Sequence, residues 1–173
     1  SYYCIRRYFM NSKKLFIWDF LFVSVIGNLS HFVYECSGNN SIVQLFAPWN
    51  ESTWEHMKLL FFPMLALVLF LFFKLPEQSP IPVALSIGTL VGLALIPILF
   101  YTYTGVLGFS VMAIDIAIFY ISVLGAFLTG WFLKDNRELA NRGGLLLTCL
   151  VILAILFFIF SYYPPGIGLF QEP

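Results

Sequence analysis

The sequence predicts an all-α integral membrane protein, a bundle of five transmembrane helices. Of its 173 residues, 60% are hydrophobic and only 10% are charged, whereas ordinary globular domains carry about 25% charged residues. The apolar residues fall into five runs, each long enough at about 1.5 Å per residue to cross a hydrocarbon layer about 30 Å thick. A chain of this length and composition is expected to form one membrane domain without a second domain.

Three regions are expected along the chain: a cytoplasmic segment over 1–14, the transmembrane domain over 15–163, and an external tail over 164–173. The residues before Met10 look like an upstream extension, because the segment from Met10 onwards resembles a natural start for a protein entering the membrane. The formal net charge is zero and no nucleic-acid-binding motif is found. The lipid bilayer is therefore the expected partner, and nucleic acid is not.

The first span is expected over 15–36. Four polar residues recur along it at spacings of four, three and four, so a helix places them on one stripe. Polar side chains inside a bilayer face protein or water rather than lipid, so this stripe is expected to point into the bundle. Its members are Ser24, Asn28, His31 and Glu35.

The second span is expected over 53–73, after a loop of turn-forming composition. Ser52 and Glu55 have the spacing of a capping box, so the helix is expected to begin there, with Pro63 as a kink. Lys58 is expected to pair with Glu55 three residues earlier or to extend its ammonium group to the membrane surface.

The third span is expected over 82–103. Gly88 and Gly92 give it the small-xxx-small spacing that lets helices approach closely. This close approach is expected either within the chain or with a second copy, which makes a homo-oligomer through these glycines one of the expected partners.

The fourth and fifth spans are expected over 107–133 and 144–163. The fourth contains one ionisable residue, Asp115, which this boundary places seven or eight residues into the helix, or about 10 Å deep. It has no neighbouring cap to explain it. The fifth span is almost purely apolar.

The basic residues predict the orientation. With five spans, Lys58 is the one of nine Lys and Arg residues on the side opposite the N-terminus. Because short cytoplasmic loops are enriched in Lys and Arg, we expect a cytoplasmic N-terminus and an external C-terminus.

This topology brings polar groups from four spans to one level, so a polar cavity is expected in the outer half of the bundle. His31 and Glu35 are one turn apart and can reach a single ion, and imidazoles with carboxylates are ligands for divalent metals. His31, Glu35, His56 and Asp115 are the expected metal ligands. The wider set of expected ligand- or ion-binding residues is His31, Glu35, Glu51, Glu55, His56 and Asp115, supported by Asn28, Asn50, Tyr101 and Tyr103.

Three functions are compatible with these residues. The first is binding of a cation or small polar ligand, with transport as an extension, because acidic and imidazole groups inside a bundle are typical of coupled transporters. The second is a metal-dependent membrane hydrolase or transferase, in which the metal activates a water molecule. The third is a structural or partner-binding membrane subunit, in which the same groups only cap helices and join them.

Several segments resemble an uncharacterised family of small bacterial membrane proteins that is known only as a domain of unknown function. The similarity extends over nearly the whole chain from about Met10. It implies a multi-pass protein of the bacterial cytoplasmic membrane, and it implies no activity. The segments that carry it are His31 to Glu35, Ser37 to Asn39, Leu45 to Pro48, Asn50 to Ser52, Trp54 to His56, Lys58 to Pro63, Phe100 to Gly105, Asp115-Ile116 and Tyr162 to Pro165.

Overall fold

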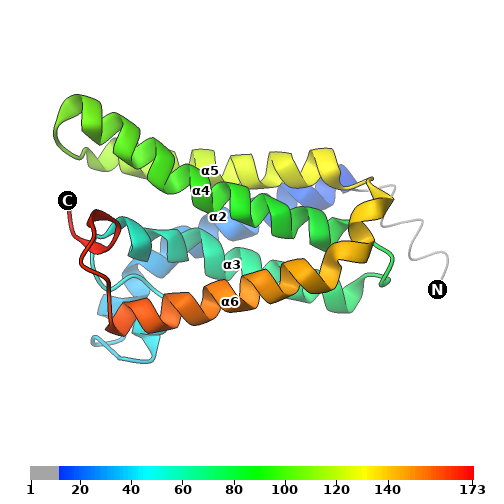
Figure 1. The fold of residues 1–173 in the computed structure, drawn as a ribbon, viewed down its shortest axis with the longest axis horizontal. Helices are drawn as coiled ribbons and strands as arrows, with labels where there is room; N and C mark the ends of the chain where they lie inside the picture. Colours follow the sequence, from blue (N-terminus) through cyan, green and yellow to red (C-terminus); the bar gives the residue numbers. More distant parts are fainter. Residues whose placement is uncertain (1–11) are drawn as a thin grey trace.

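The computed structural model describes residues 12–173 and is a bundle of long helices (Figure 1). The predicted extension before Met10 lies outside the described residues. Within 12–173 the chain forms five long α-helices, three short 3₁₀ helices and no strand. In chain order they are α2 (Ser12–Cys36), η1 (Val43–Leu45), α3 (Thr53–Lys74), α4 (Ile81–Leu107), α5 (Met112–Leu133), η2 (Arg137–Arg142), α6 (Gly143–Tyr162) and η3 (Gly168–Phe170).

The all-α fold with five spans is confirmed. All five long helices are long and apolar enough to cross a membrane, which indicates a multi-pass membrane protein. Successive long helices run in opposite directions, so that the loop after α2, the α4–α5 turn and the C-terminus lie at one end of the bundle (Figure 1). We call this end, which carries residues 37–52, the loop end.

The boundary between the third and fourth spans differs from the prediction. The helix α4 continues to Leu107, where Gly108 ends it with a left-handed φ of 79°, a conformation that glycine adopts without steric cost. The next helix, α5, begins only at Met112. Asp115 therefore lies in the first turn of α5 and not deep inside a span.

The helix α3 is the centre of the bundle. Of its most apolar stretch, 56% is buried, compared with 22% for α2 and 17% for α6. Leu60, Phe61 and Met64 are fully enclosed along it. The helices α2 and α6 instead expose apolar side chains over most of their surfaces, as helices in contact with lipid do.

The predicted close approach at Gly88 and Gly92 occurs within the chain. A Cβ atom on Gly88 would lie 2.2 Å from the carbonyl oxygen of Ala126, and one on Gly92 would lie 2.9 Å from that of Ser122. Both glycines are thus in contact with α5, and α4 with α5 forms the most extensive helix pair. This face of α4 is filled by α5 of the same chain, so it is not free for a second copy.

The C-terminal tail folds back onto the loop end of the bundle. The ring of Phe170 in η3 lies 4.9 Å from that of Trp54 at the start of α3, measured between centroids. Trp54 also packs against Phe157 of α6, at 4.4 Å. These contacts enclose the first turn of α3, where the polar residues gather.

Candidate metal centre

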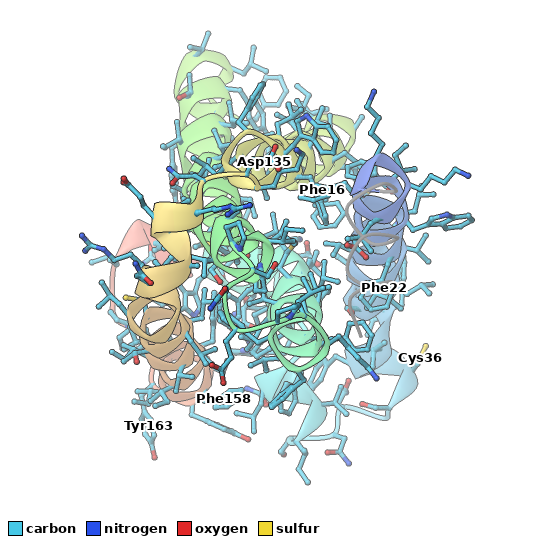
Figure 2. The ribbon with its side chains drawn as sticks, turned by 90° about the vertical axis from the view of Figure 1, so that its right-hand side faces the viewer. Phe16, Phe22, Cys36, Asp135, Phe158 and Tyr163 are labelled. Atoms are coloured by element: carbon cyan, nitrogen blue, oxygen red, sulfur yellow. The ribbon has the colours of Figure 1, made fainter. Side chains whose placement is uncertain are left out.

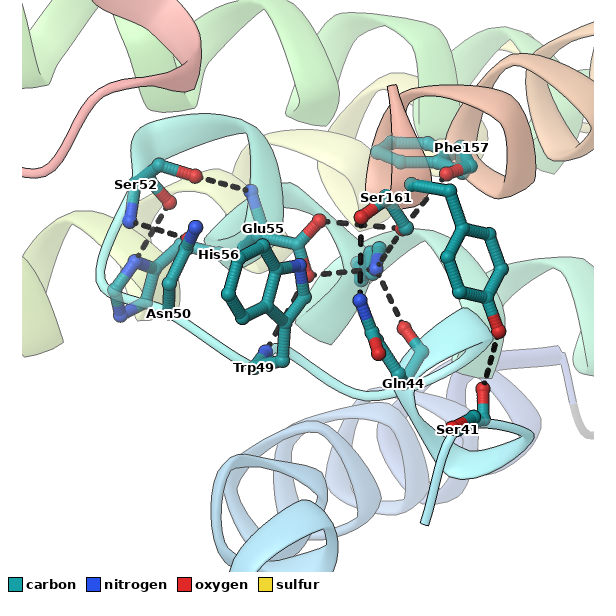
Figure 3. Close-up of polar contacts among 11 residues, drawn as sticks. Ser41, Gln44, Trp49, Asn50, Ser52, Glu55, His56, Phe157 and Ser161 are labelled. Atoms are coloured by element: carbon teal, nitrogen blue, oxygen red, sulfur yellow. Dashed lines mark hydrogen bonds and ion pairs between the residues drawn. The ribbon is translucent and has the colours of Figure 1, made fainter. Parts of the chain in front are cut away.

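A buried ion pair orders the loop end. The ammonium Nζ of Lys58 lies 2.6 Å from Oε2 of Glu55, and the two side chains are 0% and 2% exposed. The predicted pairing three residues apart is confirmed. Lys58 also donates to the carbonyl oxygen of Gln44 at 2.8 Å and to the hydroxyl of Ser161 at 2.5 Å (Figure 3). Three good acceptors therefore surround the three N–H donors of the ammonium group.

The same network fixes the loop over 37–52. Glu55 accepts the backbone N–H of Trp49 at 3.3 Å, and the side-chain amide of Gln44 donates to the carbonyl oxygen of Ser161 at 3.2 Å. The loop is thus tied to α3 and α6 from two sides. Every polar atom of the ion pair faces a protein partner, which is the arrangement of a structural network.

The helix α3 begins where the sequence predicts, but only half of the expected capping box forms, because the Glu55 carboxylate accepts from Trp49 instead of Ser52. The hydroxyl of Ser52 accepts the backbone N–H of Glu55 at 3.4 Å, which is an N-cap contact. Asn50 forms a turn directly before this cap. Its side-chain oxygen accepts the backbone N–H of Ser52 at 3.0 Å. Glu51 lies between them and its side chain is 63% exposed.

A glycine lets α2 approach α3 at the level of this turn. A Cβ atom on Gly27 would lie 2.5 Å from the carbonyl oxygen of Leu59, so the backbones of the two helices are in contact there. His31 is one turn after Gly27 on α2, and His56 is nearly one turn before Leu59 on the antiparallel α3. The two imidazole rings consequently face each other, with centroids 5.4 Å apart.

Glu51 completes a cluster with the two histidines. Its Oε2 lies 3.3 Å from Nε2 of His56, and its Oε1 lies 3.8 Å from Nε2 of His31. One ligand atom from each residue can be chosen so that all three lie within 4.8 Å of one another, as for a metal ion. The side chains of His31 and His56 are 35% and 29% exposed, so the cluster opens to solvent.

The protonation of His56 follows from its hydrogen bond. Its Nδ1 lies 3.1 Å from the carbonyl oxygen of Ser52 (Figure 3). A carbonyl only accepts, so Nδ1 carries the proton and Nε2 of the neutral ring is an acceptor. That acceptor faces a carboxylate oxygen of Glu51. This contact is favourable when a second proton on the ring makes it an ordinary ion pair, or when a metal ion lies between the two atoms.

Two of the four predicted metal ligands lie elsewhere. Glu35 is exposed near the end of α2 and is not part of the cluster, because the loop folds back to place Glu51 beside His31 instead. Asp115 accepts a hydrogen bond from Tyr103, whose hydroxyl also accepts the backbone N–H of Val111 at 3.1 Å. Asp115 thus joins α4 to the first turn of α5, where a carboxylate complements the helix dipole.

The other supporting residues are also separate from the cluster. Asn28 donates from its side-chain amide to the hydroxyl of Tyr120 at 3.1 Å, which joins α2 to α5 as an interhelical bridge. Tyr101 is exposed on α4.

The structure does not show the expected polar cavity among the described residues. Two hollows run between α2 and α5, and their linings are mainly apolar. Asn28 is the one expected site residue among those that line them. The polar groups at the loop end instead form a buried network and a solvent-exposed cluster.

Sequence reasoning missed two members of the buried network, Gln44 and Ser161, and placed Glu51 among the ion-binding residues but not among the four metal ligands. A signal for Gln44 was available, since it is the one polar residue in the apolar run from Ile42 to Phe46. Ser161 is similarly a small polar residue in the last turn of an apolar helix.

These observations define a multi-pass membrane protein with a polar loop end that carries a three-residue cluster of metal-binding type. The chain belongs to a family of unknown function, DUF6512, whose family model matches residues 5–173. No curated protein matches the chain. No solved structure matches it either.

Proposed function

We propose that the protein is a bacterial cytoplasmic-membrane protein that binds a divalent transition metal ion of the Zn²⁺ class at the loop end. His31, Glu51 and His56 are the ligands. The orientation predicted from the basic residues places this site on the external side. One observation carries the proposal: one ligand atom from each of the three side chains lies within 4.8 Å of the other two, with Nε2 of His56 only 3.3 Å from the Glu51 carboxylate.

The donor set favours a transition metal over Mg²⁺ or Ca²⁺. Two imidazoles and one carboxylate are a common zinc ligand set, whereas Mg²⁺ and Ca²⁺ prefer oxygen ligands. Zinc bonds of about 2.0 to 2.1 Å in a tetrahedron place ligand atoms roughly 3.3 Å apart. The His56 to Glu51 distance already has this value, and a small inward movement of the partly exposed His31 side chain would complete the shell.

The contact between His56 and Ser52 supports the same proposal. Histidines that bind metals commonly donate their other ring N–H to a carbonyl or carboxylate, which fixes the tautomer and the ring orientation and makes the ligating nitrogen a better donor to a metal. The carbonyl oxygen of Ser52 serves this purpose at 3.1 Å from Nδ1. Because Ser52 is also the cap of α3, the ring is supported by a fixed helix end.

Metal-dependent hydrolysis is the second candidate. Three protein ligands with a solvent-exposed fourth position are the arrangement of catalytic zinc sites, where a bound water is activated. Such an enzyme needs a nearby base, and Glu55 does not supply one because Lys58 and the N–H of Trp49 already engage it. Binding is therefore the function that we favour. We do not extend it to transport, because the hollows between α2 and α5 are mainly apolar.

Equilibrium zinc binding tests the proposal. The full chain, purified in detergent with an affinity tag free of histidine, is titrated with Zn²⁺ and its bound metal is measured by mass spectrometry. We expect one ion per chain, and about a 10- to 100-fold weaker affinity in each of His31→Ala, Glu51→Gln and His56→Ala, by analogy with the loss seen for supporting residues of metal sites. Glu35→Gln is the matched control and should bind within threefold of the wild type. Equal affinity in all five proteins would refute the site.

A further inference from the structure

The structure contains a groove between α2 and α5 that is separate from the metal-binding cluster. Its first part is lined by Lys13, by apolar side chains of both helices and by Trp131 near the end of α5. Its second part continues along the same helices past Ser24 to Asn28 and Tyr120. Phe20 and Leu21 line both parts, so the two hollows adjoin along α2.

The groove exists because α2 meets α5 at only a few points. Near its start, the ring of Phe16 lies 5.3 Å from that of Trp131, measured between centroids. Near the other end, the hydrogen bond from Asn28 to Tyr120 joins the two helices. Viewed from the end where α2 begins, α2 stands at the edge of the bundle and Phe16 reaches from it towards α5 (Figure 2). Between these contacts the ring of Phe20 lies 5.8 Å from that of Phe127, measured between centroids, and half-exposed leucines of both helices line the remaining space.

The first part of the groove is about as long as one bilayer leaflet is thick, and a lysine lies at its outer end. From Lys13 to Leu21 it extends about 12 Å along the helix at about 1.5 Å per residue, and half of a hydrocarbon core about 30 Å thick is roughly 15 Å. Lys13 lies at its outer end and forms no ion pair with any residue in 12–173. Lys14 is exposed beside it. Trp131 lies two residues before the end of α5, and tryptophan is enriched where helices reach the membrane surface.

Three other charged side chains lie near this part of the groove, and none of them lines it. Lys134 lies over the Trp131 ring at 4.5 Å and is paired with Asp135, so its charge is largely offset. Asp19 is one and a half turns deeper on α2 and is not among the residues that line the groove. Among the described residues that line this part of the groove, Lys13 is thus the one charged side chain.

We propose that this groove binds an anionic phospholipid of the leaflet at which α2 begins. One acyl chain lies between α2 and α5 against Phe20 and Leu21, and the phosphate group lies beside Lys13. An acyl chain suits the apolar lining, and an anionic head group suits the unpaired lysine. Each lysine near a membrane surface favours anionic lipid by about fivefold. The positive-inside orientation makes this the cytoplasmic leaflet.

Quenching of Trp131 by brominated lipid tests the proposal. The full chain is reconstituted in phosphatidylcholine vesicles that contain increasing fractions of brominated phosphatidylglycerol or, separately, brominated phosphatidylcholine. The difference in fluorescence between the wild type and Trp131→Phe isolates the signal of Trp131. We expect half-maximal quenching at about a fivefold lower fraction of the anionic lipid.

Two variants with one control locate the effect. Lys13→Gln should reduce the preference for the anionic lipid to nearly one. Leu21→Phe, which narrows the groove, should weaken quenching by both lipids. Lys74→Gln removes a lysine from the same end of the bundle, where it lies over the ring of Phe70 rather than in the groove, and should leave the preference unchanged.

Several results would overturn the proposal. Equal quenching by the two lipids in the wild type would exclude a site selective for anionic lipid. An equal loss of preference in Lys13→Gln and Lys74→Gln would indicate a diffuse surface charge. No quenching of Trp131 by either lipid would mean that a second copy or another protein segment fills the groove. Helix content, measured by circular dichroism, must be the same in all variants, and none of these residues belongs to the proposed metal site.

Discussion

Two polar clusters lie within one turn of each other at the start of α3, and they differ in how their polar atoms are satisfied. In the buried cluster, the side chains of Lys58 and Glu55 are 0% and 2% exposed, and their polar atoms form hydrogen bonds with protein partners. In the exposed cluster, the Glu51 carboxylate faces Nε2 of both His31 and His56, and these contacts are favourable only with a ring proton or a bound cation between the two atoms. A satisfied network stabilises a fold, whereas a solvent-exposed carboxylate between two imidazoles is suited to binding a cation.

The two clusters are also mechanically linked. Glu55 holds the backbone of Trp49, and Lys58 holds that of Gln44, so the buried pair fixes the loop that carries Glu51. A long loop would otherwise present Glu51 in many positions, and a metal ion would have to order it on binding. The buried cluster is thus expected to govern stability, and the exposed cluster to govern binding.

The largest expected change in the free energy of unfolding follows from breaking the buried pair of Lys58 and Glu55. Lys58→Met leaves the Glu55 carboxylate buried without its cation, which should lower the free energy of unfolding by about 3 to 5 kcal/mol. The double variant Lys58→Met with Glu55→Gln removes both charges while keeping an acceptor for Trp49, and should recover at least half of the loss. Unfolding in detergent mixtures with increasing dodecyl sulfate measures both. A single variant within 1 kcal/mol of the wild type would contradict the structural role of the pair.

The second-largest effect is expected from a substitution that pushes α2 away from α3 at the level of the exposed cluster. In Gly27→Ala the new methyl group meets the carbonyl oxygen of Leu59 at 2.5 Å, so the helices must move apart, at a cost of about 1 to 3 kcal/mol. His31 would move away from His56, and zinc affinity should fall about tenfold. Gly105→Ala is the control, because a Cβ there meets no atom within 4 Å. If both variants bind zinc alike, the helix contact does not position His31.

A smaller effect is expected at the α4–α5 turn, which contains a polar contact of intermediate exposure. Tyr103→Phe removes the donor to Asp115 and the acceptor for the N–H of Val111, which should cost about 1 kcal/mol of unfolding free energy. Zinc affinity should not change, since neither residue belongs to the cluster. A loss of zinc binding in this variant would mean that Asp115 contributes to the site after all.

The smallest effect on stability is expected at Glu51. Its side chain is 63% exposed, so in zinc-free buffer Glu51→Gln should alter the free energy of unfolding by no more than about 0.5 kcal/mol. The same unfolding titration, with Lys58→Met beside it, measures this. Destabilisation of 2 kcal/mol or more would show that the Glu51 contacts with the histidines hold the loop, and would remove the distinction between the two clusters.

The fold could be predicted because each of its determinants is local. Apolar runs long enough to span a bilayer gave the five helices, and Ser52 with Glu55 gave the start of α3. The helix pairing of Asn28 was expected from its place on the polar stripe, although its partner Tyr120 was not. The boundary after α4 was misjudged because Gly108, which ends that helix, was read as part of the next one.

The site was harder to predict because its geometry depends on a loop. Helical spacing favoured Glu35 as the partner of His31, since the two are one turn apart on α2. The loop reverses direction and brings Glu51 to the same place, through contacts of Gln44 and Trp49 with α3 and α6 that no local pattern encodes. Asp115 was overvalued for a related reason, because its depth was counted from a helix start that lies five residues too early.

X-ray absorption at the zinc edge tests the central claim most directly. The full chain is loaded with one equivalent of Zn²⁺, beside His56→Ala and the control Glu35→Gln. We expect nitrogen and oxygen ligands at about 2.0 to 2.1 Å with the outer-shell scattering of two imidazoles, reduced to one in His56→Ala and unchanged in Glu35→Gln. A spectrum with sulfur ligands, one without imidazole scattering, or a protein that retains no zinc would contradict it.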